Sequence, residues 1–126
     1  MGGTMSTVKA NDLQTTTGGI PTVKGQKLIP TAWVNFNGTG TVAIRDSENV
    51  SSITDVGTGR YDVNFSTAMA DANYAAVTTA GTTVNPSFSQ LWTLQTASKV
   101  NVQASNYVGT YVDATTFAVA ILGGQA

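Results

Sequence analysis

The chain has 126 residues and a formal net charge of -1, and only 10% of its residues are charged. This length is sufficient for one domain with a hydrophobic core. The absence of cysteine excludes disulfides and thiol nucleophiles, and the absence of histidine excludes the usual catalytic triads and most zinc sites. The six Lys and Arg residues are scattered and form no basic patch, which argues against a nucleic-acid partner.

Residues 1–31 are rich in Thr and Gly, and Pro21 and Pro30 interrupt any strand that could form there. A segment of this composition cannot form a core of its own. We interpret it as an extended attachment arm that docks on a partner; the alternative is a loose tail without a role. The docking hypothesis rests on spaced apolar residues, namely Val8, Leu13, Ile20, Val23, Leu28 and Ile29. The arm lacks the apolar core of a secretory signal, and no stretch of the chain is long enough to cross a bilayer, so we expect no membrane insertion.

From residue 32 onward, apolar and polar residues alternate with the period of two that is typical of half-buried strands. Helical periodicity is absent and Thr and Val are frequent, which predicts an all-β domain over residues 32–126. Asn37-Gly38 is a strong signal for a hairpin with a primed turn, and the out-of-phase pair Val50 and Ile53 predicts a β-bulge. The predicted strands cover residues 32–36, 41–45, 49–54, 60–65, 73–79, 88–95, 99–105 and 115–122. Short strands at this spacing are typical of a compact antiparallel β-sandwich or small barrel.

The strand at residues 60–65 shows the clearest pattern, because Tyr61, Val63 and Phe65 alternate with three polar residues. We expect its apolar face to join the core and its polar face to contact water. Large apolar residues of the other strands are predicted to fill the same interior. The predicted core residues are Trp33, Phe36, Val42, Ile44, Tyr61, Val63, Phe65, Phe88, Trp92 and Phe117.

Two tyrosines, Tyr107 and Tyr111, lie in a turn-like segment among polar neighbours. Their rings could stack on a sugar, pack against a neighbouring subunit, or simply close one end of the sandwich. We therefore keep Tyr107 and Tyr111 as candidate contacts for a glycan or receptor.

The carboxylate side chains do not predict an active site. A glycosidase needs two carboxyl groups at a fixed separation, one of them kept protonated by burial. Here Asp and Glu fall in turns, in linkers or on the polar face of a strand, and a turn Asp mostly caps backbone groups. The sequence therefore predicts a protein that is not an enzyme and needs no metal or other cofactor.

Three consecutive runs of the chain are distinctive as ordered sequence: AWVNFNGTGTVAIRD at 32–46, NVSSITD at 49–55 and YDVNFSTAM at 61–69. Together they closely resemble a module found in tail fibre and related virion surface proteins of bacteriophages. Many such chains also begin with a stretch like STVKANDLQTTTGG at 6–19. The resemblance covers roughly the first two-thirds of the chain, and from about Thr82 onward only a strand pattern is recognised.

This resemblance implies a non-enzymatic, usually homotrimeric β protein on the virion surface, with the arm contacting other tail or capsid proteins. Small residues at Ala75, Ala76, Ala118 and Ala120 could allow strands of neighbouring subunits to approach, or could fill a core within one chain. Fibre chains typically carry a long shaft between arm and module, and this chain has nearly none, so we expect the module to lie close to the particle. Three functions remain open: a short tail fibre for host attachment, with a surface glycan as a candidate receptor; a capsid decoration, cement or head-fibre protein that stabilises the head; and, more remotely, a glycan-cleaving tailspike-like enzyme.

Overall fold

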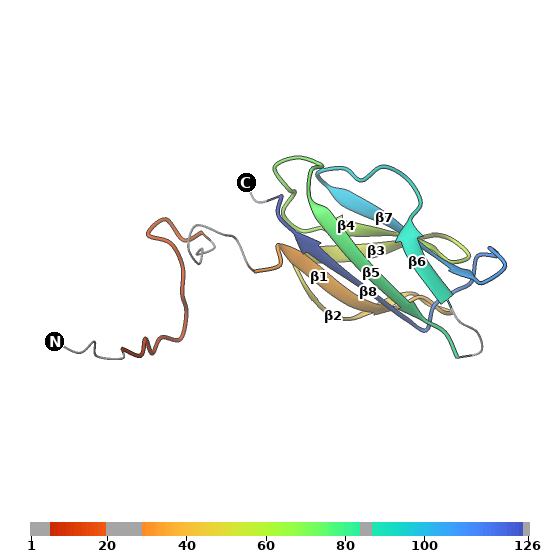
Figure 1. The fold of residues 1–126 in the computed structure, drawn as a ribbon, viewed down its shortest axis with the longest axis horizontal. Helices are drawn as coiled ribbons and strands as arrows, with labels where there is room; N and C mark the ends of the chain where they lie inside the picture. Colours follow the sequence, from red (N-terminus) through yellow and green to blue (C-terminus); the bar gives the residue numbers. More distant parts are fainter. Residues whose placement is uncertain (1–5, 20–28, 84–86, 125–126) are drawn as a thin grey trace.

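In the computed structural model, which describes residues 6–19, 29–83 and 87–124, the chain forms two antiparallel sheets that pack face to face (Figure 1). One sheet has the strand order β2-β1-β8-β5 and the other has the order β3-β4-β7-β6. The strands are β1 (Ala32–Asn37), β2 (Ala43–Glu48), β3 (Val50–Gly57), β4 (Arg60–Phe65), β5 (Ala75–Gly81), β6 (Ser87–Leu91), β7 (Lys99–Asn106) and β8 (Thr116–Leu122). The predicted all-β sandwich is confirmed, and the described residues contain no helix long and apolar enough to cross a bilayer.

The strand boundaries follow the alternating pattern closely. The strand β4 covers the predicted residues 60–65, whereas β2 begins later than predicted and β6 ends at Leu91 instead of residue 95. The predicted bulge is present, because the register between β3 and β4 shifts between Val50 and Ser52. This extra residue lets both Val50 and Ile53 pack against the core from the same strand.

The chain passes from the first sheet to the second at Asn49, which separates β2 from β3. Its φ is 54°, in the left-handed region that Asn tolerates better than most residues. The Asn49 side chain holds the neighbouring link in place, since Oδ1 accepts the backbone N–H of Thr67 at 2.7 Å and Nδ2 donates to the Thr67 carbonyl at 3.1 Å.

The hairpin between β1 and β2 forms, but its turn differs from the prediction. The two strands are joined by residues 38–42, and the glycine with positive φ is Gly40 rather than Gly38. Asn37 accepts the backbone N–H of Thr39 at 3.1 Å, so its side chain stabilises a longer loop. Gly38 is required for a different reason: a Cβ atom there would lie 2.3 Å from the Tyr61 hydroxyl.

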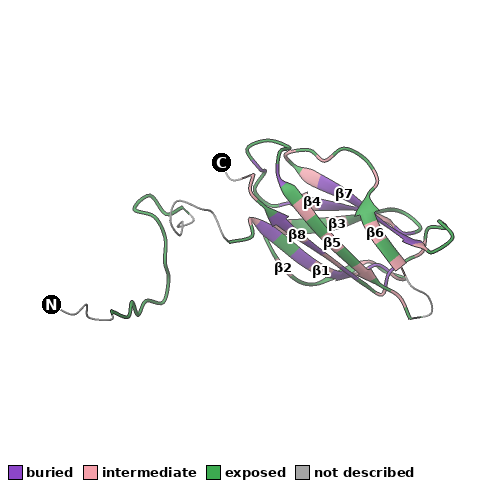
Figure 2. Ribbon diagram, in the orientation of Figure 1, coloured by how far each residue is buried: buried purple, intermediate pink, exposed green. Residues whose placement is uncertain are grey.

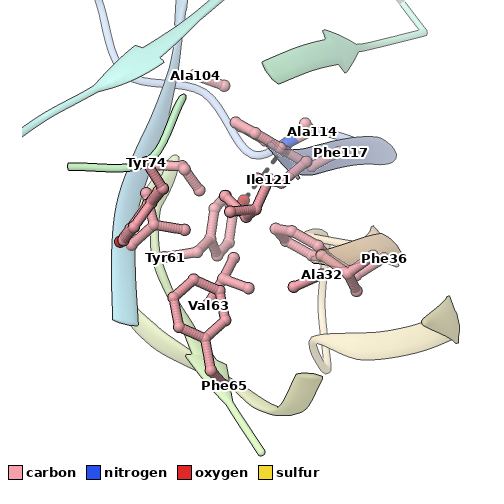
Figure 3. Packing of buried hydrophobic residues seen from close by; sticks show 14 of the residues in the cluster. Ala32, Phe36, Tyr61, Val63, Phe65, Tyr74, Ala104, Ala114, Phe117 and Ile121 are labelled. Carbon is pink, nitrogen blue, oxygen red and sulfur yellow. Dashed lines mark hydrogen bonds between the residues drawn. The ribbon is translucent and has the colours of Figure 1, made fainter. Parts of the chain in front are cut away.

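One hydrophobic core fills the space between the sheets, as the buried inner faces of the strands show (Figure 2). At its centre, Phe36 stacks on Phe117 with ring centroids 5.3 Å apart, and Tyr61 packs edge-on against both rings (Figure 3). Aromatic pairs of this kind add about 0.5–1.5 kcal/mol to their burial energy. The fully buried large side chains are Val34, Phe36, Tyr61, Val63, Val100, Val102, Phe117 and Ile121.

Several residues predicted to be in the core are not there. Trp33 is 37% exposed because its neighbour Val34 takes the inward position on β1, and Ile44 is exposed because β2 is an edge strand. Phe88 is 57% exposed, since Ser87 and Ser89 are the residues of β6 that face the other sheet. Of the other predicted core residues, Val42 is partly buried against the core and Trp92 is half-buried.

One end of the sandwich is closed by the hydroxyl group of Tyr61. It lies 2.9 Å from the Gly38 carbonyl and 3.2 Å from Asp113 Oδ1, two acceptors for its proton, and it accepts the Ala114 N–H (Figure 3). Asp113 Oδ1 also accepts the backbone N–H of Gly59 at 2.8 Å. Burial raises the pKa of Tyr61 well above its usual range, so the hydroxyl remains a hydrogen-bond donor.

The opposite end is held by Tyr74. Its hydroxyl donates toward the carbonyls of Thr96 and Lys99, at 2.8 and 3.1 Å, and its ring packs edge-on against Phe65. Burial raises the pKa of Tyr74 to about 12. The two buried tyrosines thus connect loops to the sheets through hydrogen bonds of their neutral hydroxyl groups.

The described part of the arm extends away from the sandwich (Figure 1). All side chains at residues 6–19 are exposed, and their backbone bonds are local, as in the turn in which Gly18 N donates to the Thr15 carbonyl. Among the described residues, the first backbone hydrogen bond to the sandwich comes from Thr31, whose N–H donates to the Ile121 carbonyl at 2.8 Å. The folded unit therefore includes Thr31 as well as the strands that follow it.

Candidate functional site

The outer face of the second sheet carries polar side chains that are unexpectedly buried. On β4 and β7, the inward positions are occupied by core residues such as Val63, Val100 and Val102, so Asp62 and Asn101 point outward. Both are nevertheless less than 9% exposed. The prediction that the polar face of β4 contacts water is therefore wrong at Asp62, because neighbouring side chains and loops cover it.

Asp62 is the centre of this polar layer. Its Oδ2 atom lies 2.7 Å from Lys99 Nζ, and its Oδ1 atom accepts a hydrogen bond from Asn101 Nδ2. All seven Asp and Glu residues of the chain lie in the described ranges, and Asp62 is the only buried one. Because its charge is compensated by Lys99, Asp62 does not resemble the protonated member of a catalytic carboxylate pair.

A cation lies against two aromatic rings on the same face. Arg60 Cζ is 4.1 Å from the centre of the Tyr111 ring and 5.5 Å from the centre of the Trp92 ring. We call Arg60, Trp92 and Tyr111 the arginine–aromatic cluster. Each cation–π contact stabilises such an arrangement by about 0.5–2 kcal/mol.

Three separate segments bring this cluster together. Arg60 is the first residue of β4. Trp92 directly follows β6, and its backbone N–H donates to the Asn101 carbonyl at 3.3 Å. Tyr111 comes from the connection between β7 and β8 and forms an isolated bridge with Ser105. In that connection, Asn106 Oδ1 accepts the N–H of Thr110 at 2.9 Å, which turns the chain back over the sheet.

The cluster contains hydrogen-bond donors without acceptors. Arg60 Nε and Trp92 Nε1 are buried, and neither has a partner among the described residues. Among the described residues the single ion pair joins Lys99 to Asp62, so Arg60 has no carboxylate partner among them. A buried donor without an acceptor costs about 1–3 kcal/mol. The cluster therefore carries two unsatisfied donors at a local cost in stability.

The two candidate tyrosines differ in their surroundings. Tyr111 is 39% exposed and packs on Arg60, whereas Tyr107 is 69% exposed at the turn that Gly109 N closes by donating to Asn106. Arg60 and Trp92 were not among the predicted site residues. Arg60 was predicted to be a solvated residue on a polar face, and Trp92 was assigned to the core. The sequence held a signal only for Arg60, a cation at the start of a predicted strand, because Trp92 fell inside the predicted strand over residues 88–95.

The residues proposed for docking can be placed only in part. Val8, Leu13 and Ile29 are exposed, as a docking segment requires. Ile20, Val23 and Leu28 lie outside the described residues.

Part of the outer face of the first sheet is apolar and exposed. In the register of the sheet, Ala120 lies between Trp33 on β1 and Val77 on β5, and Leu122 lies opposite Ala75. Trp33, Val77 and Leu122 are each more than a third exposed. We call this surface the apolar sheet face. Of the four small residues considered for subunit contact, Ala75, Ala118 and Ala120 lie on the outward positions, whereas Ala76 packs against the core.

Comparison of the chain with known protein families, with curated proteins and with solved structures finds no match. Its function must therefore be argued from its own residues.

Proposed function

We propose that the chain is a non-enzymatic structural protein of a bacteriophage virion, a short trimeric fibre or fibre-like protein that displays its sandwich at the particle surface for host attachment. The observation that carries this proposal is the division of the molecule into an exposed arm and a closed β domain. The resemblance of residues 32–69 to virion surface modules provides the setting.

The arm supports a docking role because its described apolar residues, Val8, Leu13 and Ile29, are exposed. Val8 and Leu13 are 78% and 63% exposed, on a segment without a core of its own. Exposed apolar side chains on an extended segment are stabilised when they bind a partner surface. Other virion proteins, of the tail or the capsid, are the partners that we propose for the arm.

The apolar sheet face supports self-association. Large contiguous apolar patches on soluble proteins mark interaction surfaces. We propose that copies of the chain meet through this face to form a homotrimer, with Ala118 and Ala120 allowing close approach and Trp33 and Val77 supplying buried area.

Two alternative functions can be distinguished from host attachment by measurements on the particle and on the host polysaccharide. A capsid cement or head-fibre protein uses the same arm and would raise the heat resistance of particles, whereas an attachment protein leaves it unchanged. A tailspike-like enzyme would release products from polysaccharide. The compensated charge of Asp62 favours the non-enzymatic proposal over this enzyme.

Deleting residues 1–29 from the full chain is expected to abolish attachment to particles that lack the protein. The sandwich should remain folded, because the hydrogen bonds of Thr31 and all eight strands are retained. Attachment is measured by co-sedimentation with such particles, and folding is measured by circular dichroism together with the mass in light scattering.

A finer version of this experiment replaces Val8 and Leu13 by serine and compares the variant with Thr7→Ser and Gln14→Ser in the same arm. Only the first pair removes apolar surface, so only the first pair should weaken attachment. Full attachment by the variant without residues 1–29 would refute the docking role.

A further inference from the structure

We propose that the arginine–aromatic cluster binds a carboxylate-bearing sugar, an acidic unit of a surface polysaccharide. The proposal names the ligand class for the attachment role and rests on the proposed function for its biological setting. Three properties of the cluster support it: the geometry of the guanidinium group, its charge, and the aromatic and amide groups around it.

The geometry leaves the guanidinium suited to an acid. Tyr111 and Trp92 lie over Arg60, at 4.1 and 5.5 Å from their ring centres. A guanidinium that packs on aromatic rings still carries N–H groups arranged as a planar fork, and such a fork matches the two oxygens of a carboxylate.

The charge of the face points to the same ligand. Lys99 compensates Asp62, while Arg60 forms no ion pair in the described part of the chain. Arg60 Nε and Trp92 Nε1 are buried donors without acceptors there. Because these two atoms are covered, a ligand reaches them only if the side chains around them shift. The uncompensated charge of Arg60 is what a ligand with negative oxygen atoms would neutralise directly.

The neighbouring groups favour a sugar over other acids. Tyr111 is partly exposed and Tyr107 and Phe88 are strongly exposed, and aromatic rings offer apolar faces to the C–H groups of a pyranose ring. Gln103 lies next to Arg60 in the sheet register but is buried. Gln90, opposite Gln103, is exposed, so one accessible amide that can bind hydroxyl groups lies near the cluster.

The test is isothermal titration of the full-length protein with oligogalacturonate and with its methyl ester, in which a methyl group on each carboxyl removes its charge. We expect the acid to bind at least about tenfold more tightly than the ester, and this preference to weaken as salt is raised. Equal affinity for the two probes, or binding of neither, would overturn the proposal.

The variant Arg60→Gln is expected to reduce the affinity for oligogalacturonate by about tenfold or more, and Arg60→Lys should not restore it because the planar fork is lost. Arg45→Gln is the matched control, since it removes the same charge from the other sheet, where Arg45 Nη2 donates to the Thr115 carbonyl. Affinity unchanged in Arg60→Gln, or reduced equally in Arg45→Gln, would contradict the assignment. If Arg60→Gln fails to fold, as thermal unfolding would show, the comparison of acid and ester on the unaltered protein decides the question.

Failure of this ligand assignment can be distinguished from failure of the proposed function. Loss of the acid preference together with arm-dependent particle attachment would overturn the ligand class alone. A clear acid preference without particle attachment would support the ligand class and refute the virion role.

Discussion

Replacing Gly59 by alanine is expected to lower the free energy of unfolding by about 4 kcal/mol, from two costs at one position. The φ angle of Gly59 is 68°, which disfavours any residue with a Cβ atom. The added Cβ would also lie 2.6 Å from the Ala104 carbonyl oxygen and 2.7 Å from the Val112 carbonyl oxygen. These are backbone atoms of two neighbouring segments, so relief of the clash requires the end of the sandwich to open.

The matched control is Gly40→Ala. The φ angle of Gly40 is 59°, but nothing lies within 4 Å of the position of its Cβ. This variant therefore reports the conformational cost alone, about 1–2 kcal/mol. Urea unfolding of both variants measures the difference. Equal destabilisation of the two would show that the close approach at Gly59 contributes nothing.

Replacing Phe117 by alanine is expected to cost about 3–5 kcal/mol of stability. The side chain is fully buried, and it contacts Phe36 on β1 and Tyr61 on β4. Its removal leaves a cavity at the place where the two sheets meet, and it also removes both aromatic pairs.

Phe88→Ala is the same chemical change on the surface. Phe88 is exposed on an edge strand, so its loss should alter the free energy of unfolding by no more than about 0.5 kcal/mol. Both residues were predicted to be in the core from the strand pattern alone. Denaturant unfolding of the two variants tests the distinction made by the structure, and comparable losses of stability would contradict it.

The alternation of buried and exposed residues along a strand could be predicted because β-structure has a short period. In β4, alternation places Tyr61, Val63 and Phe65 on one face, and all three are buried as predicted. The bulge near Val50 was also predictable, since a local break in the period requires an extra residue. These features depend on neighbours in the sequence.

Features that depend on the packing of distant segments could not be predicted. Alternation does not reveal which face of an edge strand points to the core, and Phe88 was misplaced for this reason. Gly38 was predicted to form a primed turn, whereas its small size admits the Tyr61 hydroxyl from the other sheet. Asp62 was predicted to contact water, but Lys99 and Asn101 from β7 enclose it.

The candidate site shows the same limit. Tyr111 was recognised because a tyrosine among polar loop residues is unusual. Its contact with Arg60 joins residues far apart in the chain, and Trp92 enters from a third segment. No local pattern relates these three positions, so the cluster becomes visible only once β4, β6 and β7 are placed in one sheet.

The proposals assign separate roles to separate surfaces. The arm would bind the particle, the apolar sheet face would bind other copies of the chain, and the arginine–aromatic cluster on the opposite sheet would remain free for a ligand. This separation allows each role to be removed by substitutions that leave the core of the sandwich intact.

Immunogold electron microscopy of intact particles, with an antibody against the sandwich, tests the virion role most directly. Particles purified from lysates that contain the protein are predicted to carry gold on their outer surface, either at the tail or on the head. Unlabelled particles, with the protein confined to the soluble fraction of the lysate, would contradict the proposed function.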